Sequence, residues 1–125
     1  MKTSSTGGKR KPVPLNYRSD CDNKDYPVTL LITSYRSGNL VIMLQTEVNG
    51  ETEDFELITV NFPDELLSPD QAYLDTNNVP GIEQFIEKHQ LGKPNGKKKI
   101  SGFCTYPLYE FDLIRCLEHG ALADS

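Results

Sequence analysis

Three cysteines and two histidines are the residues of this chain that could act as nucleophiles or as soft metal ligands. Cys104 lies in the segment SGFCTYPLYEFD at residues 101–112, and Cys116 precedes His119 by three positions. A structural zinc site typically draws four ligands from closely spaced pairs. Cys116 and His119 make one such pair and the sequence lacks a second, so we predict neither a metal site nor a cofactor.

The segment around Cys104 has the alternation of a β-strand, which decides how this cysteine is interpreted. Cys104 is expected to share one face of the strand with Tyr106 and Leu108. Burial among such large side chains raises the pKa of a thiol and makes it unreactive. A catalytic cysteine also needs a basic partner, usually a histidine. We therefore interpret Cys104 as a small core residue and predict no catalytic residues, with an enzyme that uses Cys104 as nucleophile as the alternative.

The charged residues are sorted into blocks, although the net charge is only −5. Residues 1–18 hold five basic residues and no acid, whereas residues 37–87 hold eleven acids and neither lysine nor arginine. Unpaired like charges destabilise a compact fold, and an anionic surface attracts basic partners. The block therefore predicts either a solubilising surface or a docking surface for a basic protein. The acids that we assign to such a docking surface are Glu47, Glu51, Glu53, Asp54, Glu56, Asp64 and Glu65.

Basic residues flank the acidic block on both sides. Several lysines on one face can bind phosphates, and such binding weakens as the salt concentration rises. The competing interpretation is a solvated turn and a solubilising arm, because the rest of the chain is net negative and would repel a duplex. The cations that we assign to nucleic-acid contact are Lys9, Arg10, Lys11, Lys93, Lys97, Lys98 and Lys99.

Runs of β-branched and apolar residues, separated by turn residues, predict the strands that would position these side chains. Asn49-Gly50 favours a type I′ hairpin turn, because both central positions of that turn need a positive φ. Pro63 is expected to end a strand, since it has no N–H to donate. The expected strands are residues 27–36, 40–48, 55–62, 72–75 and 100–111.

One main helix is predicted between residues 80 and 90. Asn77 or Asn78 is expected to cap its first turn, and Gly92 to adopt the left-handed conformation after its last turn. Residues 94–96, Pro-Asn-Gly, then predict a turn. The apolar stripe of this helix, at i, i + 3, i + 4 and i + 7, consists of Ile82, Phe85, Ile86 and His89.

These elements predict an α+β fold, with an antiparallel β-sheet of about four to five strands. One main helix packs on one face of the sheet, and a short C-terminal helix follows. Residues 1–15 are expected to form a flexible basic arm, and residues 16–125 a single domain. The chain lacks the run of about 20 apolar residues that spans a membrane, and it lacks a secretory signal. An odd number of cysteines also favours the reducing cytoplasm.

Two segments in the second half of the chain resemble a known family. They are LDTNNVPGIEQFIEKHQLGKPNG, at residues 74–96, and SGFCTYPLYEFD. Over residues 55–112 the chain resembles an uncharacterised domain-of-unknown-function family carried on mobile elements of Gram-positive bacteria. The resemblance implies a phage or conjugative-element context and no known reaction. The matching residues are Leu74, Asp75, Thr76, Asn77, Asn78, Pro80, Ile82, Glu83, Phe85, Gly92, Pro94, Gly96, Gly102, Tyr106, Pro107, Leu108, Tyr109 and Phe111.

The acidic block and the resemblance together predict a small non-enzymatic interaction protein of a phage or mobile element. Its acidic face would bind a basic, nucleic-acid-binding host protein and so counter a host defence such as a restriction or CRISPR nuclease. The alternative is a nucleic-acid-binding accessory protein that uses the basic arm and the lysines of residues 93–99. No membrane partner is expected.

Overall fold

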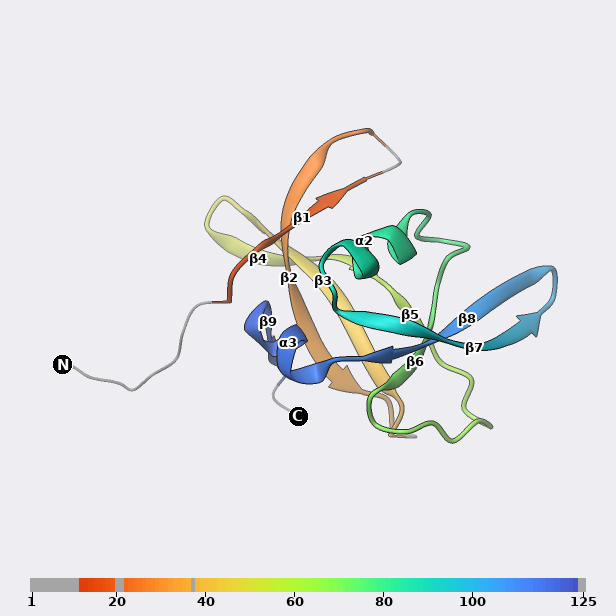
Figure 1. Ribbon diagram of the computed structural model, residues 1–125. Coiled ribbons are helices and arrows are strands. Elements are labelled where there is room, and N and C mark those ends of the chain that lie inside the picture. Colours follow the sequence, from red (N-terminus) through yellow and green to blue (C-terminus); the bar gives the residue numbers. More distant parts are fainter. Residues whose placement is uncertain (1–11, 20–21, 37, 124–125) are drawn as a thin grey trace.

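Five strands build the first of two β-sheets. The structure is a computed structural model, which describes residues 12–19, 22–36 and 38–123 (Figure 1). The sheet has the order β1-β2-β3-β4, and β9 pairs in parallel with the part of β2 that follows the β1 pairing. Its strands are β1 (Leu15–Arg18), β2 (Asp25–Ser34), β3 (Leu40–Val48), β4 (Glu51–Leu57) and β9 (Gly120–Leu122).

The β2–β3 hairpin carries the apolar face of this sheet. Leu30 pairs with Leu44, and Ile32 pairs with Ile42. Directly paired residues of antiparallel strands point to the same face, so these four side chains form one apolar surface. All four are at most 3% exposed, and this surface is therefore core.

The second sheet has four antiparallel strands in the order β5-β6-β8-β7. Its strands are β5 (Thr59–Val60), β6 (Gln71–Leu74), β7 (Gly92–Ser101) and β8 (Cys104–Phe111). Tyr73, Leu74 and Tyr109 are completely buried, so side chains on both faces of its centre are covered. The β7–β8 hairpin extends past the rest of the sheet and projects from the body (Figure 1).

The main helix, α2 (Ile82–Lys88), packs its predicted apolar stripe into the interior. Ile82, Phe85 and Ile86 are buried. The Phe85 ring packs edge-on against the ring of Tyr17 in β1, with centroids 5.4 Å apart. No helix among the described residues is long and apolar enough to cross a membrane.

The second helix, α3 (Leu113–Glu118), returns the chain to the first sheet. Asp112 caps its first turn, because the Asp112 side chain accepts a hydrogen bond from the backbone N–H of Arg115. After α3, the backbone N–H of Leu30 donates to the carbonyl of His119 at 2.9 Å, and β9 adds to β2. The predicted C-terminal helix is present, and a strand that was not predicted follows it.

One core is shared by both sheets and both helices. It contains side chains from β1, β2, β3, β6, β8, α2 and α3. The chain crosses from one sheet to the other at Ile58, whose N–H donates to the carbonyl of Ile42 at 3.1 Å. The structure confirms the α+β class, with mainly antiparallel strands and two helices in the described residues, and it divides these strands between two sheets.

The predicted third strand, residues 55–62, has different bounds in the structure. β4 begins at Glu51 and ends at Leu57, and β5 begins at Thr59 in the other sheet. The strand is interrupted because Ile58 is bound to β3 and turns the chain between the sheets. An apolar run gives no indication of such a change of sheet.

The predicted turn at residues 94–96 is wrong, and the predicted strand at residues 100–111 is present as β8 but begins at Cys104. Residues 92–101 form β7, and the Pro-Asn-Gly segment lies in a bulge of that strand. The hairpin turn lies instead at Gly102, which has a φ of 62°. Turn-forming residues fit a bulge as well as a turn, since both need unusual backbone angles.

The predicted helix caps are also wrong. Gly81 occupies the position before α2 with a φ of 85°, and no side chain caps the helix. Asn78 instead donates hydrogen bonds to the Asp75 carboxylate from its backbone N–H, at 3.0 Å, and from its side chain, at 2.9 Å. Gln90, with a φ of 57°, takes the left-handed conformation expected of Gly92. Gly92 begins β7, where an added Cβ would lie 2.7 Å from the carbonyl oxygen of Glu110.

The N-terminal arm was predicted to extend to residue 15. Residues 1–11 of that arm lie outside the described residues. The backbone N–H of Val13 donates to the carbonyl of Glu118 at 3.2 Å, and the Leu15 side chain is buried in β1. The last residues of the predicted arm therefore contact the folded body.

Candidate functional site

The β3–β4 hairpin brings together most of the acids assigned to a docking surface. Its turn has the predicted geometry, because Asn49 and Gly50 have φ values of 54° and 83°. Four of its acids are exposed, and no salt bridge is found for any of them among the described residues. We call this group the acidic edge, and it consists of Glu47, Glu51, Glu53 and Asp54.

The acidic edge lies at the border of the first sheet. β4 is the last strand in the sheet order and pairs only with β3 among the described strands. The pairing of Glu47 with Thr52 places Glu47 on the same face as Asp54, and the alternation places Glu51 and Glu53 on the other face. The carboxylates therefore line both sides of a two-stranded ribbon.

Glu56 belongs to the same strand and, by its pairing with Leu44, to the face of Glu51 and Glu53, but it is less exposed than they are. Its side chain is half-buried. Burial raises the pKa of Glu56, and the negative charge of Asp75 raises it further. Glu56 is therefore a poor candidate for contact with a partner.

Asp64 and Glu65, which were assigned to the same docking surface, lie beside lysines of β7. The Glu65 carboxylate is 2.7 Å from Nζ of Lys99 and 3.9 Å from Nζ of Lys97. Asp64 contributes to the raised pKa of Lys99, after the hydrogen bond from Lys99 to Glu65. The fold thus pairs acids predicted to contact a protein partner with lysines predicted to contact nucleic acid. The charges of both groups are therefore partly neutralised.

A hydrogen-bonded cluster is built around Glu65. The buried Tyr73 hydroxyl donates to Glu65 at 2.8 Å. Burial, followed by this hydrogen bond, raises the pKa of Tyr73 to about 12. The hydrogen bonds from Lys99 and Tyr73 lower the pKa of Glu65. This cluster fixes the loop that carries Glu65 against the second sheet.

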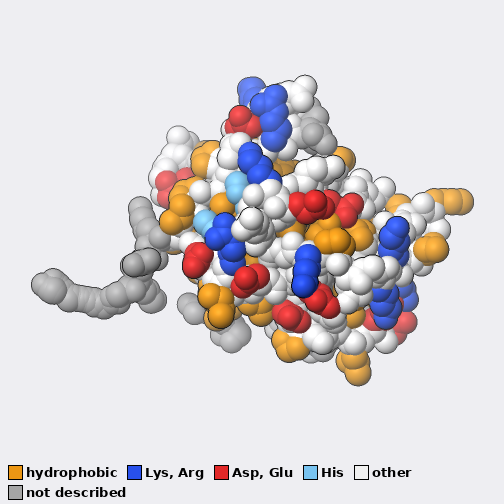
Figure 2. Space-filling model, in the orientation of Figure 1, with side chains coloured by type: hydrophobic (Ala, Val, Ile, Leu, Met, Phe, Trp, Pro, Cys, Tyr) orange, Lys and Arg blue, Asp and Glu red, His pale blue; other side chains and the backbone are white. Residues whose placement is uncertain are grey.

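Four of the seven cations predicted for nucleic-acid contact lie on β7, namely Lys93, Lys97, Lys98 and Lys99. Lys93, Lys97 and Lys98 are exposed, and Lys98 has no salt bridge among the residues that the structure describes. In Figure 2, basic side chains line the right-hand end of the molecule beside hydrophobic ones, where Figure 1 draws the β7–β8 hairpin. The other predicted cations, Lys9, Arg10 and Lys11, lie outside the described residues.

Two exposed apolar side chains accompany these lysines. Ile100 is 73% exposed, and Phe103, beside the hairpin turn, is fully exposed. The sequence-based prediction selected neither residue, because both fell within the expected strand at residues 100–111. The signal that could have identified them is their position next to a run of lysines and a glycine.

Cys104 and Cys116 do not belong to a metal-binding group in the described part of the chain. Cys104 is half-buried near the end of the β7–β8 hairpin, so the prediction of a buried core cysteine is wrong for it. Cys116 is the buried one, and its thiol lies 3.6 Å from the carbonyl of Leu91. Burial, and then the charge of Asp112, raises the pKa of Cys116 to about 12. Cys21 lies outside the described residues.

Both histidines contact backbone carbonyl groups. Nδ1 of His119 lies 2.9 Å from the carbonyl oxygen of Val13, and Nε2 of the half-buried His89 lies 3.0 Å from that of Asn16. Within residues 12–19, 22–36 and 38–123, no group of three or more His, Cys, Asp or Glu side chains is placed to hold a metal ion. The prediction that the protein is not an enzyme stays a prediction.

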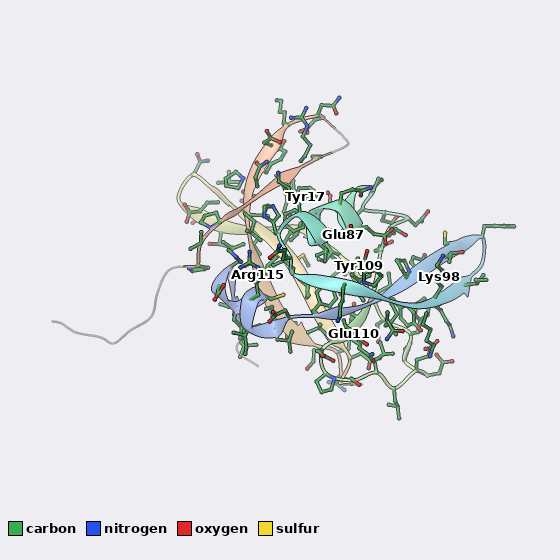
Figure 3. All side chains as sticks on the ribbon, in the orientation of Figure 1. Tyr17, Glu87, Lys98, Tyr109, Glu110 and Arg115 are labelled. Atoms are coloured by element: carbon green, nitrogen blue, oxygen red, sulfur yellow. The ribbon has the colours of Figure 1, made fainter. Side chains whose placement is uncertain are left out.

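An open hollow of about 660 Å³ lies between the end of α2 and the start of β7. Glu110, in its lining, accepts hydrogen bonds from Asn95 at 2.7 Å and from Gln71 at 3.3 Å, and these lower its pKa. Glu87, also in the lining, points toward the Tyr109 hydroxyl at 3.5 Å (Figure 3). Burial, and then hydrogen bonding to Glu83 of α2, raises the pKa of Tyr109. These acids therefore serve to hold α2 and β7 on β8.

The two hairpins and the core between them fall within one family domain. A model of the family described as Domain of unknown function (DUF4313) matches residues 29–121, from within β2 to within β9. The chain belongs to this family. The match confirms the predicted resemblance to an uncharacterised domain family and extends it well beyond residues 55–112. Comparison of the chain with curated proteins and with solved structures found no match.

Proposed function

We propose that this DUF4313 protein is an interaction protein that binds a basic partner through the acidic edge. The observation that supports this proposal is the position of four exposed carboxylates, without a salt bridge in the described residues, on the hairpin at the border of the sheet. Like charges held together at a surface attract an oppositely charged partner and speed its encounter.

The backbone of β4 offers a second kind of contact. A border strand has N–H and C=O groups that are not used within its own sheet, and an extended segment of a partner can pair with them. Lysine and arginine side chains of such a segment would alternate between its two faces. They would thus meet Glu47 and Asp54 on one face of the ribbon, and Glu51 and Glu53 on the other.

The resemblance to a family of mobile elements suggests the class of partner. Many basic proteins of a bacterial host bind nucleic acids, and a host-defence nuclease is one such protein. We therefore propose that the partner is a basic, nucleic-acid-binding host protein that uses an extended cationic segment. Acids on a border strand also prevent it from pairing with other chains, so solubility is the competing role of these residues.

The test compares two variants that change the net charge equally. One reverses three acids of the acidic edge, Glu51→Lys, Glu53→Lys and Asp54→Lys. The control reverses three acids elsewhere, Asp64→Lys, Asp70→Lys and Glu118→Lys. We expect the first variant to bind a labelled lysine-rich extended peptide about tenfold or more weakly than the natural chain, and the control to bind about as the natural chain does. Fluorescence anisotropy measures the affinities, and circular dichroism checks the fold.

Affinity capture from a bacterial lysate then identifies the partner as a protein retained by the control and lost by the edge variant. Equal weakening of peptide binding in both variants would mean that only net charge matters. That result, or an absence of peptide binding by the natural chain at low salt, would contradict the proposal.

A further inference from the structure

The β7–β8 hairpin differs in charge and shape from the surface that carries the acidic edge. The end of the β3–β4 hairpin and the end of the β7–β8 hairpin lie on opposite sides of the molecule (Figure 1). β7 contains four lysines and no acid, whereas β4 contains acids and no lysine or arginine. A partner of the β7–β8 hairpin is therefore expected to be anionic.

The two faces of this hairpin have different neighbours. Lys99 and Tyr106, which pair across the strands, turn toward the body, where Tyr106 contacts Phe62 and Lys99 contacts Glu65. The alternation of a strand then places Lys98 and Ile100 on the opposite face.

This opposite face holds a cation and an apolar side chain. Lys98 and Ile100 are exposed there, and Lys98 extends from the hairpin in Figure 3. At about 3.3 Å of rise per residue, two residues along a strand separate them by about 7 Å. The exposed Phe103 lies at the end of the same ribbon.

We propose that the β7–β8 hairpin binds single-stranded nucleic acid. Because β7 is the border strand of its sheet, Lys93, Lys97 and Lys98 would contact phosphates of a strand that runs along this border, Lys98 from one face and Lys93 from the other. The Phe103 ring would stack on an unpaired base. Stacking on an aromatic ring and contact of lysines with the backbone are the two contributions from which most sequence-tolerant single-strand binding is built.

Charge favours a single strand over a duplex. A duplex carries one charge per about 1.7 Å of its axis, against about 3.4 Å for one strand, so the net charge of −5 on the protein repels a duplex more strongly. A membrane surface would contact the end of the hairpin but not Lys93 near the base of the ribbon. The distribution of lysines along the whole strand therefore favours a linear polyanion.

The experiment measures binding of fluorescent oligothymidylate to the full chain by anisotropy, at several salt concentrations. With three phosphate contacts, we expect log K to fall with log salt with a slope of about −2. Replacement of Lys97 and Lys98 by Gln should reduce the magnitude of this slope by about 1.4. Phe103→Ala should weaken binding about tenfold and leave the slope unchanged, while Phe103→Tyr should retain binding.

Matched controls carry the same changes elsewhere on the surface. Lys24→Gln with Lys88→Gln removes two exposed lysines, and Ile114→Ala removes an exposed apolar side chain. We expect both controls to bind like the natural chain. A failure of the natural chain to bind at low salt would overturn the proposal, and so would equal weakening by the hairpin variants and the controls. Binding to phosphatidylserine vesicles that depends on Phe103, without binding to the oligonucleotide, would assign the hairpin to membranes and also overturn it.

Discussion

Glu65 connects three parts of the molecule through one carboxylate. It accepts a hydrogen bond from the buried Tyr73 hydroxyl of β6 and pairs with Lys99 of β7. A residue in an acidic stretch of sequence would be expected at an exposed surface. Its partners are distant along the chain, so its role as a structural anchor becomes visible only in the fold.

Loss of this anchor should destabilise the protein. Glu65→Leu leaves the buried Tyr73 hydroxyl without an acceptor, and we expect the free energy of unfolding to fall by about 1 to 3 kcal/mol. Glu65→Gln keeps an oxygen acceptor and should lower the free energy of unfolding by less than Glu65→Leu does. Urea unfolding measures both changes, and a double-mutant cycle with Tyr73→Phe isolates the pair. A Glu65→Leu variant as stable as the natural chain would refute this role.

The contribution of Glu65 to the free energy of unfolding should depend on pH. Because the folded-state pKa of Glu65 lies below its ordinary value of 4.5, its stabilisation is fully present above that pH and is lost as the pH falls through the folded-state pKa. The difference in stability between the natural chain and Glu65→Gln should therefore be constant near neutrality and shrink on acidification. A difference that grows on acidification would contradict the assigned direction of the shift.

At the scale of elements, the parallel pairing of β9 with β2 depends on one glycine. A Cβ added at Gly120 would lie 2.0 Å from the carbonyl oxygen of Leu30, closer than any real contact allows. Leu30 is itself core and pairs with Leu44, so the backbone of β2 has little freedom to move. A side chain at this position must displace β9.

Gly120→Ala should therefore lower the free energy of unfolding by about 1 to 3 kcal/mol. Hydrogen exchange should show loss of protection at the N–H of Ala123, which donates to the carbonyl of Ile32 at 2.8 Å. Gly102→Asn is the matched control, because Gly102 has open space around it and Asn tolerates its φ of 62°. Equal stability of Gly120→Ala and the natural chain would show that β9 does not need this close approach.

At the scale of the whole molecule, the core joins two sheets that carry opposite charges at their free borders. Buried side chains of both sheets meet at α2, where Phe85 contacts Tyr17. The acidic edge and the lysines of β7 thus sit on one rigid body while facing different directions. The two proposed partners would therefore bind at separate places on the molecule.

A shared core predicts a single unfolding transition. We expect calorimetric and van't Hoff enthalpies to agree, since neither sheet has a separate core. Phe85→Ala should lower the free energy of unfolding by about 3 to 5 kcal/mol and shift the whole transition. Circular dichroism and calorimetry check this, with Leu66→Ala, at an 88% exposed position, as the control. Two separate transitions in the natural chain would contradict a common core.

Local patterns predicted the elements whose structure depends on neighbouring residues. β2 was predicted within two residues at each end, and β3 was predicted at its observed bounds. The Asn49-Gly50 turn was predicted with its two positive φ values. The stripe of α2 was correct at Ile82, Phe85 and Ile86. In each case the alternation or the turn residues act over a few positions, which a sequence displays directly.

Contacts between distant segments were missed. β1 is short and half polar, and it exists because it pairs with β2 and places Tyr17 against Phe85. The bulge in β7 and the change of sheet at Ile58 likewise depend on which strands meet. Of the seven acids assigned to docking, four share the acidic edge, whereas Asp64 and Glu65 lie beside lysines and Glu56 is half-buried.

The amino-acid sequence alone determined the α+β class, the main helix, the β2–β3–β4 hairpins and the separation of charge into blocks along the chain. These properties follow from local backbone preference and from composition, which need no knowledge of distant neighbours. Only the tertiary structure decided which charges remain free and which neutralise one another. Coulomb interactions depend on distance in space, and folding sets that distance independently of separation along the chain.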